Sequence, residues 1–326
     1  MSETYEGKNI LITGGAGFIG SNLAHRLVSL NANVTVVDAL LPDYGGNLFN
    51  LQGIEDQIEF STADIRNSHR MKELVKGQDY IFNLAGQISH VDSMTDPFTD
   101  AEINYMSQLK LLETCREHNP DTKIIYTGTR QVYGKPQELP IHESHPVNPI
   151  DVNGISKLAG EWAHIMYNNV HKLRTCSLRL TNTFGPRQLM KHNRQGFIPF
   201  FIKQAMKNGE IEIYEGDQLR DINYVEDVVD ALLLAGKGDT EGKIYNLGHH
   251  EPVTLGQFTD TLIEVCGSGS YKFVPFPEEK KKIDVGSTYC DYSKIKDELG
   301  WEPKTSLEQG LEQTIDFYKK HGSHYY

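Results

Sequence analysis

The sequence predicts an α/β fold, built on a doubly wound parallel sheet with a smaller C-terminal α/β lobe. Three observations support this prediction. A glycine-rich turn near the N-terminus joins an apolar run to a helical pattern, strands and helices then alternate through the first half of the chain, and the alternation becomes irregular after about residue 181. Strands that alternate with helices are connected by right-handed crossovers, so their sheet is expected to be parallel.

The glycine-rich turn lies between a short strand (residues 9–13) and a helix that starts near Ser21. Its glycines, Gly14, Gly17 and Gly20, have the spacing Gly-x-x-Gly-x-x-Gly. Such a turn lets the backbone approach a pyrophosphate, which the free N–H groups of the helix N-terminus then bind. The turn therefore indicates the first unit of a Rossmann dinucleotide-binding sheet.

A second strand (residues 33–37) leads directly into Asp38. This carboxylate follows the glycines by about 20 residues, where an acidic group accepts hydrogen bonds from the adenosine ribose of a dinucleotide. Because the same carboxylate would repel a 2′-phosphate, the sequence predicts NAD rather than NADP as the cofactor.

The later elements follow from apolar runs and from helical spacing. In the helix expected over residues 100–118, Ile103, Met106, Leu109 and Leu112 recur at that spacing and are expected to face the core. The other expected elements are strands over 57–61, 79–84, 122–127 and 174–180, and helices over 68–76, 154–171, 224–235, 293–299 and 307–318.

The change of rhythm near residue 181 divides the chain into two parts. We expect an NAD-binding Rossmann domain over 1–180, with a segment near 223–250 that returns to it. Residues 181–326 are then expected to form mainly a substrate-binding lobe. A chain of 326 residues is long enough for two lobes in one compact body.

The bulk composition is typical of a globular protein, with 23% charged and 38% apolar residues. The formal net charge of −12 argues against general binding to nucleic acid or to an anionic membrane. Apolar runs fall short of the roughly 18 residues that span a bilayer, and the N-terminus lacks a signal-peptide pattern. We therefore expect a cytoplasmic protein with no nucleic-acid or membrane partner.

Sulfur and imidazole side chains indicate neither a disulfide framework nor a metal site. The four cysteines lie far apart, and no His/Cys grouping has zinc spacing. We expect reduced thiols and no bound metal. Met94, Met106, Met166 and Met206 are interpreted as fillers of the hydrophobic core.

Two later segments carry a family resemblance. Residues 128–134 (Gly-Thr-Arg-Gln-Val-Tyr-Gly) follow a strand, and residues 153–161 (Asn-Gly-Ile-Ser-Lys-Leu-Ala-Gly-Glu) begin a helix. With the glycine turn and Asp38, they resemble the extended short-chain dehydrogenase/reductase family, specifically nucleotide-sugar epimerases and dehydratases of the UDP-glucose 4-epimerase type. The resemblance covers nearly the whole chain, and its further markers are Asp64-Ile65, residues 83–86, Asn182, residues 184–187, Arg220-Asp221 and residues 299–303.

The resemblance implies hydride chemistry on a nucleotide-diphosphate sugar. In such enzymes a sugar hydroxyl, usually at C4, loses its proton to a tyrosine while its carbon gives a hydride to NAD. A Ser or Thr hydroxyl steadies the substrate oxygen, and a lysine binds the nicotinamide ribose and lowers the tyrosine pKa. Thr129 matches the Ser/Thr position and Lys157 matches the lysine, but the tyrosine position is occupied by Asn153.

An amide has no proton to exchange near neutral pH, so Asn153 cannot be a general base. Four explanations stay open. A tyrosine was replaced deliberately; the protein lost the redox step and kept binding; Asn153 places a water that relays the proton; or another group is the base. The nearest candidates for that base in the sequence are His90, Tyr133, Glu143 and Asp151.

Two further departures from the family pattern favour a natural subgroup with a remodelled active site. Arg130-Gln131 stands where relatives carry small residues, or, in dehydratases, an Asp-Glu pair. Gly286 takes the place of a late arginine that binds the pyrophosphate. We expect Arg130 and Asn153 to contact the reacting sugar, and we favour an epimerase. The alternatives are a 4,6-dehydratase or other sugar-nucleotide enzyme, and a non-redox protein that only binds NAD and a sugar nucleotide.

The expected site residues follow from the resemblance, except that Arg194 has no match in relatives and that Asn153 and Arg130 take roles that the family does not predict. Catalytic positions are Thr129, Asn153, Lys157 and Arg130. Relatives commonly form homodimers through the helices expected at 100–118 and 154–171, and we expect the same here. The cofactor-binding set is Gly14, Gly17, Phe18, Ile19, Gly20, Asp38, Asp64, Ile65, Leu84, Ala85 and Lys157; the substrate-binding set is Gln87, Asn182, Arg187, Arg194 and Arg220, with Arg194, Lys281 and Lys282 as candidates to replace the late arginine.

Overall fold

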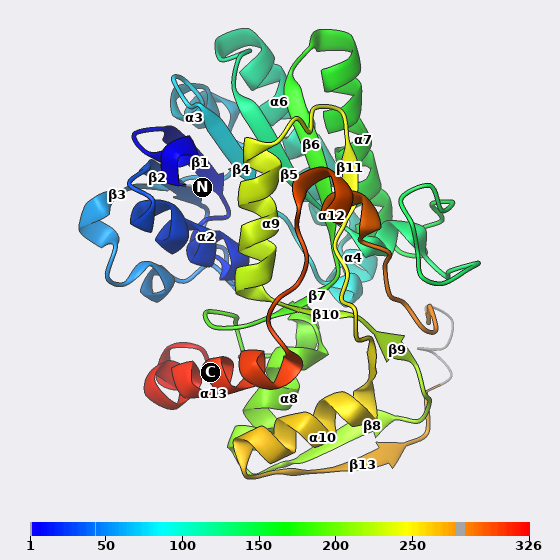
Figure 1. Cartoon of the computed structure of the whole chain (residues 1–326). Helices are drawn as coiled ribbons and strands as arrows, with labels where there is room; N and C mark the ends of the chain where they lie inside the picture. Colours follow the sequence, from blue (N-terminus) through cyan, green and yellow to red (C-terminus); the bar gives the residue numbers. More distant parts are fainter. Residues whose placement is uncertain (1, 43, 278–283) are drawn as a thin grey trace.

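The computed structural model describes residues 2–42, 44–277 and 284–326. Its centre is a seven-stranded sheet in which all paired strands are parallel, as predicted (Figure 1). The strand order reverses beside β1, and ligands of such sheets bind at the carboxyl ends near this reversal. In spatial order the strands are β3 (Ile58–Thr62), β2 (Asn33–Asp38), β1 (Asn9–Thr13), β4 (Tyr80–Asn83), β5 (Lys123–Thr129), β6 (Arg174–Leu180) and β11 (Ile244–Asn246).

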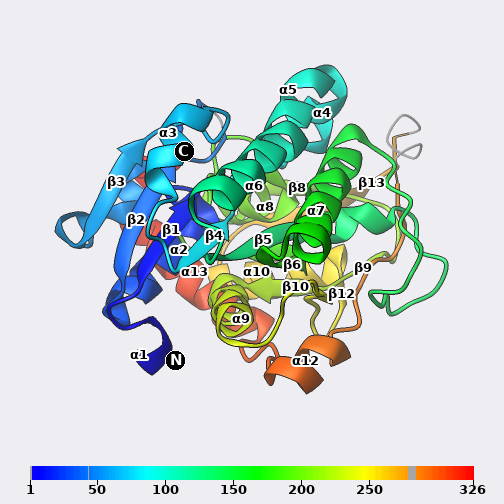
Figure 2. The same ribbon diagram turned by 90° about the horizontal axis from the view of Figure 1, so that it is seen from above.

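Helices cover both faces of the sheet, so its central strands are apolar on both sides. Ile10, Leu11 and Ile12 of β1 are fully buried. Figure 2 shows α6 and α7 on one side of the sheet and α9 on the other. The covering helices are α2 (Phe18–Ser29) and α9 (Val225–Lys237) on one face, and α3 (Ser68–Leu74), α6 (Ser107–His118) and α7 (Val152–His171) on the other.

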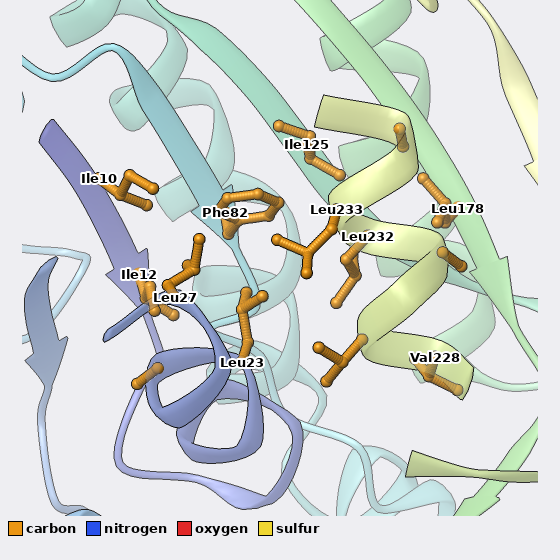
Figure 3. Close-up of a cluster of buried hydrophobic side chains, with 14 of the residues drawn as sticks. Ile10, Ile12, Leu23, Leu27, Phe82, Ile125, Leu178, Val228, Leu232 and Leu233 are labelled. Carbon is orange, nitrogen blue, oxygen red and sulfur yellow. The ribbon is translucent and has the colours of Figure 1, made fainter. Parts of the chain in front are cut away.

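One core cluster joins α2 and α9 to the sheet. Leu23 and Leu27 of α2 face Leu232 and Leu233 of α9, and all four are fully buried (Figure 3). Phe82 of β4 lies between the two helices and the strands. This packing fixes the N-terminus of α2, and with it the glycine turn, against the sheet.

The helix predicted over 100–118 is more complex than expected. It begins earlier, at α5 (Pro97–Ala101), passes through a π-helical turn, η3 (Glu102–Met106), and continues as α6. A π turn contains one residue more than an α turn and changes which face later residues present. Ser107 Oγ and Gln108 Nε2 donate to the Ile103 carbonyl within this turn.

The interpretation of the methionines as core fillers is wrong for three of the four. Met94 of α4 (His90–Thr95), Met106 of the π turn and Met166 of α7 are exposed, because these segments turn an apolar side outward as well as inward. Met206 packs against the core of the second lobe, as expected.

A second, smaller group of elements lies beyond the carboxyl ends of the strands (Figure 1). It has its own buried cluster, which includes Phe184, Phe201, Phe258 and Leu311. Its main elements are α8 (Phe197–Met206), β8 (Glu210–Tyr214), α10 (Leu255–Cys266), β13 (Ser270–Val274) and α13 (Leu307–His321). Two short strand pairs belong to it as well: β7 (Asn182–Phe184) pairs with β10 (Ile222–Tyr224), and β9 (Leu219–Arg220) pairs with β12 (Val253–Thr254). Two further helices, α1 (Ser2–Tyr5) and α12 (Ser293–Leu299), lie against the large sheet.

Across residues 2–42, 44–277 and 284–326, no helix combines the length and the apolar character needed to cross a membrane. Within the same ranges, no three His, Cys, Asp or Glu side chains gather as metal ligands do. All four cysteines are free thiols.

Candidate active site

A cavity of about 500 Å³ lies at the carboxyl ends of the large sheet. Its wall comes from the β1–α2 turn, from the ends of β2, β4, β5 and β6, from the start of α7, and from α8 and β9 of the smaller lobe. The predicted site residues that line it are Gly14, Gly17, Phe18, Ile19, Gly20, Asp38, Asp64, Ile65, Leu84, Ala85, Thr129, Arg130, Asn153, Lys157, Asn182, Arg194 and Arg220.

The glycine turn forms a tight cradle at one end of the cavity. Gly14 has a φ of +67°, and a Cβ there would lie 2.9 Å from the Ala85 nitrogen. A Cβ on Gly20 would clash with the Gly14 carbonyl. The N-cap of α2 is Gly17, which has no side chain to cap the helix, so the backbone N–H groups of the first turn have no capping side chain. The turn suits the pyrophosphate of a dinucleotide.

Asp38, the last residue of β2, lies beside this cradle. Its carboxylate accepts hydrogen bonds from the backbone nitrogens of Ala16 (3.1 Å) and Leu40 (2.9 Å). Burial raises the pKa of Asp38, against the opposing effect of these two hydrogen bonds. Nearby, Asp64 forms an ion pair with Arg66, whose hydrogen bonds lower the pKa of Asp64.

Thr129 and Lys157 meet the cavity from neighbouring elements. Thr129 ends β5, and its hydroxyl accepts a hydrogen bond from the Gln131 nitrogen at 3.2 Å. Burial lowers the pKa of Lys157 to about 8, although the charge of Asp100 opposes this shift. A Cβ on Gly86 would overlap Lys157 Nζ, so the glycine leaves room for the lysine head group.

Asn153 is buried at the start of α7, and its side-chain nitrogen is engaged with three acceptors. Its Nδ2 lies 2.9 Å from the Gln87 carbonyl, 3.1 Å from Gln87 Oε1 and 2.9 Å from Asp100 Oδ2. Asn104, in the π turn, donates to the same Gln87 carbonyl and to the same Asp100 oxygen. The amide of Asn153 therefore holds a buried polar network together.

Of the four candidate bases, His90 alone is on the cavity wall that the structure describes, and Tyr133 and Glu143 lie well away from it. Tyr133 donates to Asn246 Oδ1 at 2.7 Å and accepts from Arg179, and burial raises the pKa of Tyr133 to about 12. Glu143 accepts from the Asn246 nitrogen at 2.8 Å. Both side chains belong to a network behind β5 and β6.

The other two candidates lie together. Asp151 caps α7, because its Oδ1 accepts from the Gly154 nitrogen at 2.7 Å. Its Oδ2 contacts His90 Nδ1, and His90 lines the cavity. Burial raises the pKa of Asp151, but the hydrogen bond and charge of His90 outweigh burial and leave the pKa lowered.

Two arginines form a cationic end of the cavity. Arg220 donates to the carbonyls of Leu219 (2.9 Å) and Gly286 (2.6 Å), so the residue at the expected late-arginine position supports Arg220 through its backbone. Burial lowers the pKa of Arg220 to about 10, and the charge of Arg130 acts in the same direction. Burial raises the pKa of the adjacent Asp221 to about 7, against the opposing charge of Arg130.

The remaining predicted substrate residues are divided between the cavity and its surroundings. Asn182 lines the cavity and donates to the Asp221 carbonyl at 3.2 Å, and Arg194 lines it and pairs with Asp92 at 3.4 Å. Gln87 is not on the described wall, because it is buried against Asn153. Lys281 and Lys282 lie outside the described residues.

Arg187 is also missing from the described cavity wall. Its Nη1 donates to Asn22 Oδ1 at 2.7 Å, and its guanidinium lies 5.6 Å from the centre of the Phe317 ring. Burial lowers the pKa of Arg187. The structure thus places this arginine between α2 and α13, where it ties the two lobes together.

Sequence reasoning missed the roles of Asp100 and Gln131. Asp100 is fully buried beside Lys157, and Gln131 links Thr129 to His90. An acidic residue in the first turn of a helix is ordinary, so the sequence carried no signal for Asp100. The sequence did carry a signal for Gln131, because this residue departs from the family pattern.

Comparisons with known proteins agree with this geometry. The family described as GDP-mannose 4,6 dehydratase matches residues 11–314. A UDP-glucose 4-epimerase from Mycolicibacterium smegmatis is 30% identical over 312 residues, which are 95% of this chain and 98% of the relative. A dTDP-glucose 4,6-dehydratase from an Actinoplanes species is 29% identical over 327 residues, which are 96% of this chain and 98% of the relative.

Solved structures give the same result. The UDP-glucose 4-epimerase of Thermotoga maritima, crystallised with UDP-glucose, superposes with a TM-score of 0.87 at 33% identity, over 96% of this chain and 99% of that one. A dTDP-glucose 4,6-dehydratase from Streptomyces venezuelae, crystallised with NAD, has a TM-score of 0.87 at 26% identity, over 97% of this chain and 98% of that one.

Proposed function

This chain belongs to the GDP-mannose 4,6-dehydratase family, and we propose that it is an NAD-dependent nucleotide-sugar epimerase that oxidises its sugar transiently at C4. One observation carries the proposal. The glycine cradle, Asp38, Thr129, Lys157 and the arginine pair of Arg130 and Arg220 all line a single cavity of about 500 Å³. A cavity of this kind, with few polar groups at set places, is what a cofactor and a small substrate require.

The cofactor end of the cavity has the groups that NAD needs. The first turn of α2 offers N–H groups to the pyrophosphate, Asp38 accepts from the adenosine ribose, and Lys157 binds the nicotinamide ribose. Bound there, NAD supplies a hydride acceptor. The protein's own contribution is to hold the sugar hydroxyl near Thr129 and to exclude water around it.

The cationic end suits the diphosphate of a sugar nucleotide. Arginine forks match phosphate oxygens, and Arg220 is held in place by two backbone carbonyls. The Arg130 guanidinium has no hydrogen-bond or ion-pair partner within the part of the chain that the structure describes, and it lines the cavity next to Thr129. We assign it to the sugar or its adjacent phosphate, with Asn182 and Arg194 as further contacts.

An epimerase is favoured over a dehydratase because of Arg130-Gln131. Dehydratases of this family carry an Asp-Glu pair at that place, which removes the C5 proton and protonates the leaving hydroxyl. A guanidinium stays protonated in proteins and an amide does not titrate, so neither residue can perform these steps. The relatives above include both activities.

A second candidate function is NAD and sugar-nucleotide binding without turnover. The observation that favours it is Asn153, whose amide is bound to Asp100 and Gln87 and cannot accept a proton. The intact set of Asp38, Lys157 and Arg220 on the cavity wall argues for a working site instead.

We also propose that the chain forms a homodimer. An apolar face runs over α4, α5, the π turn and α7, with Phe98 81%, Val170 63% and Trp162 55% exposed. Ile155, Trp162, Met166 and Val170 lie at helical spacing along α7. Faces of this kind mark association sites. The family resemblance implies pairing through the helices expected at 100–118 and 154–171, and the π turn and α7 fall within those ranges. Residues 1–180, with the segment near 223–250, then form the NAD-binding domain, and 181–326 mainly the substrate lobe.

The compartment proposed is the cytoplasm. The four cysteines are free thiols, and Cys115, Cys176 and Cys290 are buried. Burial raises the pKa of Cys176 to about 11, so this thiol stays protonated and unreactive at neutral pH. Reduced, buried thiols are typical of proteins from a reducing compartment.

The test of the function is direct. Purified protein is supplied with NAD and with UDP- and dTDP-hexoses one at a time, and the products are separated by configuration at C4. An epimer appearing with no net change in NAD supports the proposal. A 4-keto-6-deoxy sugar indicates a dehydratase, and unchanged sugars with measurable binding indicate the non-redox function.

A further inference from the structure

His90 stands at the centre of a short chain of side chains on the cavity wall. It is the first residue of α4, whose cap is Ser89. Its Nδ1 contacts Asp151 Oδ2, and its Nε2 contacts the side-chain nitrogen of Gln131. The three residues come from α4, from the start of α7 and from the segment after β5, so separate parts of the fold converge on one imidazole.

The partners fix the protonation pattern of the ring. An ionised carboxylate only accepts, so His90 Nδ1 carries the hydrogen that points at Asp151. The Gln131 nitrogen can only donate, so Nε2 carries the lone pair. Asp151 is itself held by the Gly154 nitrogen and is only 4% exposed, whereas the His90 side chain is 43% exposed. The ring is therefore anchored at Nδ1 by a buried carboxylate, and its Nε2 is capped by the Gln131 amide at the cavity wall.

The Nε2 side of the ring is linked to Thr129, the residue expected to hold the sugar hydroxyl. The backbone nitrogen of Gln131 donates to Thr129 Oγ1 at 3.2 Å, while its side chain reaches His90. One residue thus links the hydroxyl that positions the substrate to the imidazole. Gln131, Thr129 and His90 all line the cavity. The amide oxygen of Gln131 is buried and has no hydrogen-bond partner among the residues described, so this amide is not tied elsewhere.

We propose that His90 takes the proton of the sugar hydroxyl in place of the absent tyrosine, and that Asp151 orients the ring and stabilises its charged form. The proposal rests on the proposed redox function. The O–H proton passes to His90 Nε2, displacing the Gln131 amide from it. The C–H bond breaks with its electron pair going to NAD⁺, which leaves a keto sugar and reduced cofactor. Return of hydride to the other face of the carbonyl, with the proton from Nε2, completes the epimerisation.

The other groups on the described wall suit this task less well. Burial lowers the pKa of Lys157 only to about 8, so at neutral pH it is a cation and cannot accept a proton. Asp38 and Asp64 lie by the cofactor cradle. Among charged groups, Asp151, the N-cap of α7, contacts His90, and Arg130 and Lys157 lie on the same cavity wall. Asp92, on the helix of His90, pairs with Arg194 from η5 (Asn193–Gln195), and Asp100 from α5 acts on Lys157.

The experiment follows reduction of NAD at 340 nm by stopped flow in the full-length protein, from pH 5 to 10, with a UDP-hexose that the wild type oxidises. The variants are H90Q, D151N and the control H142Q. His142 hydrogen bonds Glu138 and Ser144, and is not on the cavity wall that the structure describes. H90Q is expected to lower the rate about 100-fold or more at pH 7, the usual effect of losing a general base, with sugar-nucleotide affinity unchanged. H142Q should match the wild type.

D151N distinguishes a positioning role from a purely structural one. Loss of the carboxylate removes the acceptor that holds His90 Nδ1, so D151N should lower the rate of NAD reduction while sugar-nucleotide affinity stays unchanged. Long-range ¹⁵N NMR gives a readout that does not depend on turnover: His90 should carry its proton on Nδ1 in the wild type and lose this preference in D151N. H90Q with the wild-type rate and profile, or a ring protonated on Nε2 alone, overturns the proposal. If the wild type reduces no NAD with any sugar, the proposed redox function is contradicted, and the proposed role of His90, which depends on that function, is contradicted as well.

Discussion

The side-chain amide of Asn153 donates a 2.9 Å hydrogen bond to Asp100 Oδ2, and Asp100 is the acidic charge that acts on Lys157. At the position where relatives carry a catalytic tyrosine, the asparagine side chain is thus hydrogen-bonded to a buried carboxylate. Asp100 Oδ1 has no partner within the described ranges, so the network depends on its Oδ2 contacts with Asn104 and Asn153. This arrangement favours a remodelled site over the loss of a single residue.

Replacing Asn153 by tyrosine should therefore not restore a standard site. The N153Y change removes a hydrogen bond from a buried carboxylate, which is expected to cost about 1–3 kcal/mol of unfolding free energy, and turnover should not rise. Urea unfolding and the 340 nm assay measure the two effects. The control is N169Y on the exposed side of the same helix, which should leave both unchanged. A large gain in turnover for N153Y would instead indicate that only the base had been lost.

Arg130 is expected to hold the substrate. R130M removes an unpaired cation from the cavity, and loss of a hydrogen bond to a charged group costs about 1.5–3 kcal/mol, so the Kd for a UDP-hexose should rise about 10- to 150-fold. Affinity for NAD should not change, because the charge of Arg130 acts at Arg220 and Asp221, the end of the cavity assigned to the sugar nucleotide. Calorimetric titration of both ligands measures this. The matched control is R116M, at a residue that pairs with Glu113 on α6. Equal losses for NAD and sugar nucleotide would contradict the assignment.

His164 should make the fold sensitive to acid. It is fully buried, Nδ1 lies 2.7 Å from the Gly160 carbonyl, and burial lowers its pKa from 6.5 to about 4. The unfolded chain therefore binds more protons between these values, so this contribution to stability is complete above pH 6.5 and is lost as the pH falls toward 4. The slope approaches about 1.4 kcal/mol per pH unit.

Urea unfolding at several pH values measures the slope for His164, with H164Q as the variant in which it should shrink. An NMR titration that finds His164 protonated near pH 6.5 would show the burial argument to be wrong. Burial also lowers the pKa of His25 and His249, so these residues add to the slope in the same direction.

The apolar face on α7 gives a prediction about assembly. W162D places a charge in the centre of the proposed dimer contact, where buried aromatic residues often dominate affinity. Sedimentation should show a dimer for the wild type and a monomer for W162D, with the fold retained because Trp162 is 55% exposed. The control is E117Q, a polar change near the end of α6. A wild-type monomer at micromolar concentration would contradict the proposed dimer.

The fold was largely predictable because its signals are local. The Gly14–Gly20 turn and each apolar run predict a structural element from a few neighbouring residues. For β6 even the predicted bounds are correct. The π turn at Glu102–Met106 was not predictable, because it depends on how Ser107 and Gln108 bond to the Ile103 carbonyl. The exposed methionines were misread for a related reason, since helical spacing alone does not separate a core face from an association face.

The site was predictable as far as the family pattern reaches. Thr129, Lys157 and Arg220 could be named from the sequence, and the departures at Asn153 and Gln131 were visible there. What the departures do was not visible, since the contacts of Asn153 with Asp100 and of Gln131 with His90 join segments far apart in the chain. The placement of Arg187 against Asn22 likewise depends on how the two lobes pack.

Hydride transfer to NAD in a cavity whose residue 153 is an asparagine separates an enzyme from a protein that only binds. The decisive measurement is stopped-flow absorbance at 340 nm of the purified protein with NAD, as UDP- and dTDP-hexoses are mixed in one at a time. A transient rise is expected with at least one sugar, and H90Q should lose it. Sugars that bind with no transient rise would contradict the proposed redox function and leave a protein that binds both ligands without hydride transfer.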